Sequence, residues 1–222
     1  RDRLSFDDAR TLFHEFGHAL HQILSNVTYE PLSGTSVSRD FVELPSQLFE
    51  HWLTVPEVLK RFAVHYKTKS PISEKLMERL IGASNYDMGY QTVEYTSSAL
   101  VDLYFHLEDT EKDVMELQNE ILSKIGLPEA INMRHATPHF AHVFSGGYYA
   151  AAYYSYMWSE VMDADAFSAF EELDNPFDAD LAKSLEDNIL SKGNSLDPEI
   201  AYKRFRGSLP KVDALLRGRG LI

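Results

Sequence analysis

Two histidines near the start of the chain, His14 and His18, are four positions apart, and Glu15 follows the first of them. In a helix, residues four apart lie on the same face. Both imidazoles can therefore bind one metal ion, most suitably zinc, while Glu15 takes a proton from the zinc-bound water. The alternative is a pair of partly exposed helix histidines beside a surface glutamate. Apolar flanking residues, which would bury the pair, favour the metal site.

Catalytic zinc needs a third protein ligand and an open coordination position. The best candidate is Glu43, on the next predicted helix, because Phe41, Val42 and Leu44 around it disfavour a simple solvated role. Glu50 lies seven residues further on, on the same helix face, and can hold a ligand histidine by its second ring nitrogen. An ordinary surface role for Glu50 stays equally open at this point.

A second group of polar residues begins at His142 and runs through a glycine-rich segment to Tyr156. Tyr149 and Tyr156 are seven residues apart, so one face of a continuous helix presents both. Hydrogen-bond donors of this kind stabilise the oxyanion that forms when a peptide bond is attacked. The commoner explanation for tyrosines at this spacing is an aromatic core stripe, and spacing alone does not exclude it.

The composition of the 222 residues limits the classes of partner. The net charge of −13 argues against binding to nucleic acid, which needs a basic face, and against a polybasic membrane contact. The chain has no cysteine, which excludes disulfides and thiolate ligands and is consistent with a cytoplasmic location. No apolar run approaches the ~18 residues that a membrane span requires.

Hydrophobic periodicity predicts a mainly α fold in one region, 1–222, with no internal repeat or linker. Ser5 and Asp8 indicate a capping box before the first helix, whose broad apolar surface predicts burial. Residues 27–37 are the expected place for a short β segment. Further helices are expected over 40–54, with Pro45 opening or kinking it, and over 56–66, 73–83, 85–107, 113–125, 149–170, 175–190, 197–206 and 210–216.

The first predicted helix begins within a few residues of Arg1, which is not a methionine. A metal site so close to a chain end is poorly enclosed. We therefore expect the sequence to be the C-terminal piece of a longer protein.

Three segments together resemble the M3 (thimet oligopeptidase) family of zinc metallopeptidases: 13–21, which holds the two histidines, 32–35, and 39–47, which holds Glu43. The forms of 39–43 and 50–52 are most similar to the bacterial peptidyl-dipeptidase members. The resemblance spans essentially the whole chain. It implies a helical zincin fold of the neurolysin-like type, with zinc bound by His14, His18 and Glu43 and with Glu15 as the general base. It also implies a missing N-terminal part that supplies the opposite wall of a substrate channel.

The same resemblance implies that His142, Tyr149 and Tyr156 hold the substrate carbonyl and stabilise the intermediate, with Gly146, Gly147 and Tyr148 in the substrate-binding loop. Tyr148 stands where many family members have a small residue, so counting forward from His142 selects Tyr148 instead of Tyr149. We favour Tyr149, because it keeps the seven-residue spacing to Tyr156 on one helix.

These observations predict an enzyme with one Zn²⁺ per chain that hydrolyses short peptides and releases C-terminal dipeptides. One alternative is an endo-acting oligopeptidase. Another, from a different class, is a non-catalytic helical module that zinc stabilises and that binds peptides. Glu15 argues against this module, because a purely structural metal site does not need a base.

Overall fold

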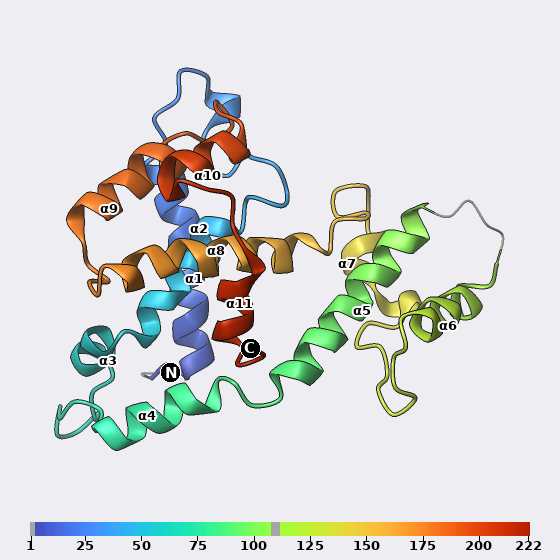
Figure 1. Cartoon of the computed structure of the whole chain (residues 1–222), viewed down its shortest axis with the longest axis horizontal. Helices are drawn as coiled ribbons and strands as arrows, with labels where there is room; N and C mark the ends of the chain where they lie inside the picture. Colours follow the sequence, from blue (N-terminus) through green and yellow to red (C-terminus); the bar gives the residue numbers. More distant parts are fainter. Residues whose placement is uncertain (1–2, 108–111) are drawn as a thin grey trace. The chain divides into compact units, whose positions relative to one another are not determined.

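The computed structural model describes residues 3–107 and 112–222, and these residues confirm the predicted mainly α fold (Figure 1). Their extended pairing is limited to one isolated bridge between Val64 and Pro71. Within the described ranges, no helix is both long and apolar enough to cross a membrane. The α-helices are α1 (Phe6–Ile23), α2 (Leu44–Glu50), α3 (Pro56–Phe62), α4 (Glu74–Ala83), α5 (Met88–Leu107), α6 (Val114–Lys124), α7 (Ala141–Phe144), α8 (Ser155–Glu172), α9 (Ala179–Leu185), α10 (Pro198–Arg206) and α11 (Val212–Gly218).

Short 3-10 turns η1 (Glu30–Leu32), η2 (His51–Thr54) and η3 (Thr137–His139) and a π turn η4 (Glu186–Leu190) complete the described elements. The chain divides into two compact units. Unit 1 comprises Arg1–Tyr86 and Trp158–Ile222, and unit 2 comprises Asp87–Met157. The single catalytic region expected from the sequence stays a prediction.

Local sequence signals determine where α1 and α2 begin. Ser5 Oγ accepts a hydrogen bond from the backbone N–H of Asp8 at 3.1 Å, and Asp8 accepts one from the backbone N–H of Ser5 at 2.8 Å. This is the predicted capping box, which satisfies two amides at the start of the helix. Pro45 lies in the first turn of α2, so it opens that helix and does not kink it.

Helices α1 and α2 cross at Gly17, between the two histidines of the motif. A Cβ atom at Gly17 would lie 2.6 Å from the carbonyl oxygen of Pro45 and 2.6 Å from Cα of Ser46. Real Cβ atoms do not approach backbone atoms this closely, so only glycine permits the crossing. The contact brings the first turn of α2 beside the face of α1 that carries His14 and His18. Figure 1 shows α2 lying against α1.

Each unit has its own apolar core. In unit 1, α8 and the C-terminal helices cover the region around α2, and the buried residues are Phe41, Leu44, Leu48, Met162, Ala166, Phe170, Leu185, Ile189, Leu190, Ala201, Tyr202 and Phe205. In unit 2, residues from α5, α6 and α7 surround a smaller core, made of Val101, Leu117, Ile121, Met133, Phe140 and Val143. Two separate cores explain why the contacts divide at residues 86–87 and 157–158.

The expectation that α1 is buried all round is wrong for this chain. Only Gly17 and His21 of α1 are buried, whereas Leu12, Phe16 and Ile23 are 57%, 48% and 72% exposed. Phe16 touches the ring of Phe49 on α2, with centroids 5.8 Å apart, but about half of its surface and most of the surfaces of Leu12 and Ile23 stay exposed. Helix α1 therefore keeps an exposed apolar strip beside the face that packs against α2.

The β segment expected over 27–37 is also wrong. Pro31 lies in the 3-10 turn η1, and Gly34 has a positive φ of 51°. The backbone N–H of Asn26 and the carbonyl of Leu32 each make one hydrogen bond, to Ser191 and Asn194 respectively. Single bonds to a turn cannot form a ladder, so no strand develops.

The long aromatic helix starts at Ser155 and not at Tyr149 as predicted. Ala151 has a φ of 57°, in the left-handed region, and this conformation cannot belong to an α-helix. Tyr149 therefore lies in a turn before α8, and the argument that chose it by position on a continuous helix is wrong. The helix expected over 175–190 likewise begins later, at Ala179, and changes to a π turn after Leu185.

Replacing Gly17 with alanine tests the crossing of α1 and α2. We expect Gly17→Ala to lower the free energy of unfolding of unit 1 by about 1–3 kcal/mol, because the added methyl group meets backbone that cannot move aside. Gly82→Ala is the matched control, since it lies in helix α4 with open space around its Cβ position. It should raise the stability by about 0.5–1 kcal/mol. Urea unfolding of the two variants measures both changes, and equal effects would contradict the close crossing.

Candidate metal centre and aromatic cluster

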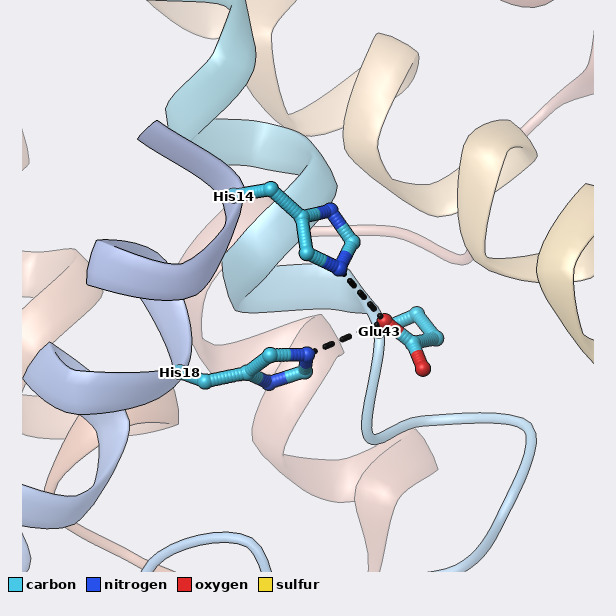
Figure 2. A group of neighbouring side chains, drawn as sticks. All are labelled: His14, His18 and Glu43. Atoms are coloured by element: carbon cyan, nitrogen blue, oxygen red, sulfur yellow. Dashed lines mark ion pairs between the residues drawn. The ribbon is translucent and has the colours of Figure 1, made fainter. Parts of the chain in front are cut away.

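His14, His18 and Glu43 come together in unit 1. Figure 2 shows the two imidazoles extending from α1 toward the Glu43 carboxylate, which precedes α2. Oε2 of Glu43 lies 3.3 Å from Nε2 of His14 and 3.2 Å from Nε2 of His18. One ligand atom from each of the three residues lies within 4.8 Å of the others. In the described part of the chain this is the only such group of histidine and acidic side chains.

The predicted neighbour Glu50 lies against the other ring nitrogen of His14. Its Oε1 is 2.7 Å from Nδ1 of His14, and a carboxylate can only accept, so His14 donates this hydrogen bond. The bond orients the ring so that Nε2 points at Glu43. A carboxylate behind a histidine ligand is the usual support of a zinc site.

Hydrogen bonding within this group shifts the pKa values of His14 and Glu43 in opposite directions. Hydrogen bonds to Glu43 and then to Glu50 raise the pKa of His14 to about 10. Burial opposes ionisation of Glu43, but hydrogen bonds with His14 and His18 prevail and hold its pKa far below its usual range. Without metal, a proton therefore bridges His14 and Glu43, at the place where a cation would bind.

The donor set fits zinc. Two imidazole nitrogens and one carboxylate oxygen converge, which is the three-ligand arrangement of catalytic zinc sites and leaves a fourth position open. Glu43 is mostly buried and already attracts positive charge between the two rings. These residues would hold the ion, and Glu50 would keep His14 in the orientation that binding needs.

Glu15 lies one residue beyond His14 on α1 and is exposed. Within the described residues its carboxylate makes no hydrogen bond or ion pair. A side chain in this position is free to bind a water molecule beside the three ligands. His21, one turn beyond His18 on α1, is instead fully buried, and burial lowers its pKa to about 4, so it is a neutral core residue.

His142, Tyr149 and Tyr156 come together in unit 2. Nε2 of His142 lies 3.1 Å from the hydroxyl oxygen of Tyr156, and its ring centroid is 4.3 Å from that of Tyr149. Tyr148 is 71% exposed, and its ring lies edge-on to that of Tyr149 with centroids 5.1 Å apart. The close approach of the Tyr149 and His142 rings supports Tyr149 as the partner of His142, although Tyr149 lies in a turn and not on the helix.

The predicted glycines lie in the exposed turn between α7 and Tyr149. Gly146 has a φ of 144°, which side chains rarely allow, and there is open space where a Cβ would stand at either glycine. The turn is thus open on the side of these glycines, which is compatible with a bound peptide passing it.

Sequence reasoning missed two residues beside this cluster. The ring of Tyr153 lies 5.4 Å from His142, and buried Asp102 binds the backbone beside Tyr153. Asp102 and His106 are four positions apart on the apolar helix α5. A carboxylate and an imidazole four residues apart, on a helix that is otherwise apolar, are the sequence pattern that indicates a buried polar pair here.

The model of Peptidase family M3 matches residues 3–221. The chain is 41% identical over 223 residues to a dipeptidyl carboxypeptidase of Escherichia coli (strain K12) and 39% identical over 219 residues to oligopeptidase A of the same organism. It is 34% identical over 224 residues to a thimet-like oligopeptidase of Dictyostelium discoideum. These alignments cover 97–98% of this chain but only 32% of each relative.

Removing the charge of Glu50 tests its role behind His14. We expect Glu50→Gln to weaken zinc binding by about 10- to 100-fold, because a neutral amide orients and polarises the imidazole less well. Competition with a chelator of known affinity measures the change. Glu57→Gln, at an exposed glutamate in the first turn of α3, is the control and should leave zinc affinity unchanged. Unaltered affinity in Glu50→Gln would remove Glu50 from the site.

The raised pKa of His14 predicts how zinc binding depends on pH. His14 keeps its proton up to pH about 10 in the metal-free chain, and zinc must displace that proton. Apparent zinc affinity should therefore rise about tenfold per pH unit from pH 7 to 9. Histidine carbon NMR of the metal-free protein provides the direct check, since the His14 signal should stay at its imidazolium position through this range. A transition near pH 6.5, the ordinary histidine value, would contradict the hydrogen bonding described.

Proposed function

Because the chain belongs to peptidase family M3, we propose that it is the catalytic part of a zinc metallopeptidase that hydrolyses short peptides. The family predicted from the motifs is thereby confirmed. The observation that carries the proposal is the convergence of His14, His18 and Glu43, with exposed Glu15 next to the first ligand. The proposed metal stoichiometry is one zinc ion per chain.

A bound zinc ion would act as a Lewis acid that polarises the scissile carbonyl and makes a water molecule more acidic. Glu15 takes a proton from the attacking water and delivers it to the leaving amine as the peptide bond breaks. Glu50 keeps the His14 ring in its orientation through a hydrogen bond, so that the three ligands stay in place during catalysis. The contacts of His14 with Glu43 and Glu50 support the roles of these residues, and the exposed position of Glu15 next to His14 supports its role as the base.

The proposed roles of the unit 2 cluster are those that the family resemblance implies. His142, Tyr149 and Tyr156 hold the substrate carbonyl and stabilise the oxyanion by hydrogen bonds. Gly146, Gly147 and Tyr148 belong to the loop that contacts the peptide. The contacts of His142 with Tyr149 and Tyr156 support the assignment of these three residues, because they bring an imidazole and two phenols together in unit 2.

Release of C-terminal dipeptides is the mode of cleavage that we propose. Segments 39–43 and 50–52, which include Glu43 and Glu50, have the form of peptidyl-dipeptidases. The second candidate is internal cleavage, supported by the similar identity to oligopeptidase A, 39% against 41% for the dipeptidyl carboxypeptidase.

The proposed partner of this part of the enzyme is the N-terminal part of the same protein. The chain spans about a third of the length of its relatives, and Leu12, Phe16 and Ile23 of α1 leave an apolar face for additional structure to cover. The proposed substrates are peptides. We propose no contact with nucleic acid or membrane, because the net charge of −13 disfavours both. The proposed location is the cytoplasm.

Glu15→Gln separates the enzyme from a non-catalytic zinc module. In the full-length protein we expect kcat for a quenched fluorogenic peptide to fall by about 10²- to 10⁴-fold, since the amide cannot accept the proton. Zinc content, measured by atomic absorption, should stay at that of the wild type, and the surface variant Glu57→Gln should keep full activity. Normal hydrolysis by Glu15→Gln would show that Glu15 is not the base.

A peptide with a free and then an amidated C-terminus separates the two modes of cleavage. A peptidyl-dipeptidase must recognise the C-terminal carboxylate of its substrate. We therefore expect the amidated peptide to be cleaved at least about tenfold more slowly, because a charge-assisted contact is lost. Mass spectrometry of the products identifies the bond that is cut. Equal cleavage of both peptides at internal bonds would establish the endo-acting alternative.

A further inference from the structure

Asp102 lies on α5 in unit 2, and only 1% of its surface is exposed. Each of its carboxylate oxygens accepts a hydrogen bond from the backbone of the turn before α8. Oδ1 accepts from the N–H of Ala151 at 3.1 Å, and Oδ2 accepts from the N–H of Tyr153 at 2.9 Å. Nδ1 of His106, one turn further along α5, lies 3.0 Å from Oδ1. A buried carboxylate is thus satisfied almost entirely by one turn, about fifty residues away in the sequence.

The turn needs such support. Ala151 has a φ of 57°, which is unfavourable for a residue with a Cβ atom and persists only where surrounding structure imposes it. Asp102 binds the N–H of this residue. On the other side of the turn, the hydroxyl of Tyr95 donates to the carbonyl of Tyr153, and the two rings stack with centroids 5.0 Å apart. Asp102 and Tyr95 of α5 therefore hold 151–153 by three of its backbone groups, and Nδ1 of His106 is a further acceptor, 3.3 Å from the backbone nitrogen of Ala151.

The turn positions the aromatic cluster. The backbone N–H of Ala152 donates to the carbonyl of Tyr149 at 3.0 Å, so Tyr149 belongs to the same turn. The ring centroids of Tyr149 and Tyr153 lie 4.3 Å and 5.4 Å from that of His142. Tyr156, whose hydroxyl meets His142, follows in the first turn of α8. A shift of residues 151–153 would move Tyr149, Tyr153 and Tyr156, the three tyrosines that contact His142 in this cluster.

We propose that Asp102 is a positioning residue for peptide hydrolysis. It fixes the turn before α8 so that Tyr149 and Tyr156 keep their places around His142. The proposal rests on the proposed function, because it assigns a purpose to the cluster that this function uses. Asp102 itself does not touch substrate. Its charge matters because a carboxylate offers two acceptors to two N–H groups, whereas an amide offers one acceptor and one competing donor.

Asp102→Asn in the full-length, zinc-loaded protein tests the proposal, because the side chain keeps its shape and loses one acceptor. We expect kcat to fall by about 10- to 100-fold, as when transition-state donors lose their alignment, while KM changes by less than about threefold. Zinc content should stay unchanged. Hydrogen–deuterium exchange should become at least about tenfold faster in the peptide that covers 149–155.

Two further variants separate positioning from general stability. Gln118→Ala removes another buried acceptor of unit 2, which takes hydrogen bonds from the N–H and the hydroxyl of Thr137 at 2.8 Å each. Thr137 lies outside the turn, so kcat should stay within about twofold of the wild type, as for a site that does not touch the donors. Tyr95→Phe keeps the ring and removes the hydroxyl bond to Tyr153. It should lower kcat and speed exchange in the same direction as Asp102→Asn, and it decides the matter if that variant does not fold.

The outcomes divide cleanly. Loss of kcat together with faster exchange of 149–155, in Asp102→Asn or Tyr95→Phe but not in Gln118→Ala, supports the proposal. Unchanged kcat, unchanged exchange, or an equal loss in Gln118→Ala overturns it. A wild-type protein without peptidase activity would overturn the proposed function, and with it the catalytic part of this inference. The exchange measurement would then still decide whether Asp102 holds the turn.

Discussion

The close crossing of α1 and α2 at Gly17 is the constraint on which the metal centre depends. With no side chain at this position, the backbone of Pro45 and Ser46 lies directly against α1. That contact puts Glu43, just before α2, opposite the histidine face of α1, and it puts Glu50, at the end of α2, behind His14. The glycine between His14 and His18 therefore sets how closely Glu43 and Glu50 approach the histidine face of α1.

Electrostatics then holds the group together without a metal ion. Glu43 lies between two imidazoles and Glu50 beside one of them, so protonation of His14 offsets the cost of bringing two carboxylates close. The next residue after Glu50 extends the network, because His51 Nε2 lies 2.6 Å from the buried carboxylate of Asp163 on α8. This ion pair links the end of α2 to the helix that covers it. His14, His18 and Glu43 are therefore already arranged to bind a cation, and the proton on His14 occupies the place of that positive charge.

Most of the fold followed from local signals, and the errors have physical causes. The capping box at Ser5 placed the start of α1, and the helices expected from Ser73 and Asp113 begin one residue later, because each of these side chains caps its own helix. The helix expected from Asp40 begins only at Leu44, with Pro45 in its first turn. The long aromatic helix was predicted to start at Tyr149, six residues too early, because the bond from Asp102 that stabilises Ala151 comes from another helix. The spacing of the histidines indicated a metal pair. How far α1 is buried depends on structure beyond its own sequence, so periodicity alone overestimated it.

We propose that His14, His18 and Glu43 bind one zinc ion and leave one coordination position open for chemistry. A crystal structure of the zinc-loaded full-length protein, with diffraction recorded on both sides of the zinc absorption edge, would locate the ion. We expect one anomalous peak about 2.0–2.2 Å from Nε2 of each histidine and from a carboxylate oxygen of Glu43. A zinc peak bound elsewhere, or one that lacks Glu43 as a ligand, would show that these residues do not form the metal site.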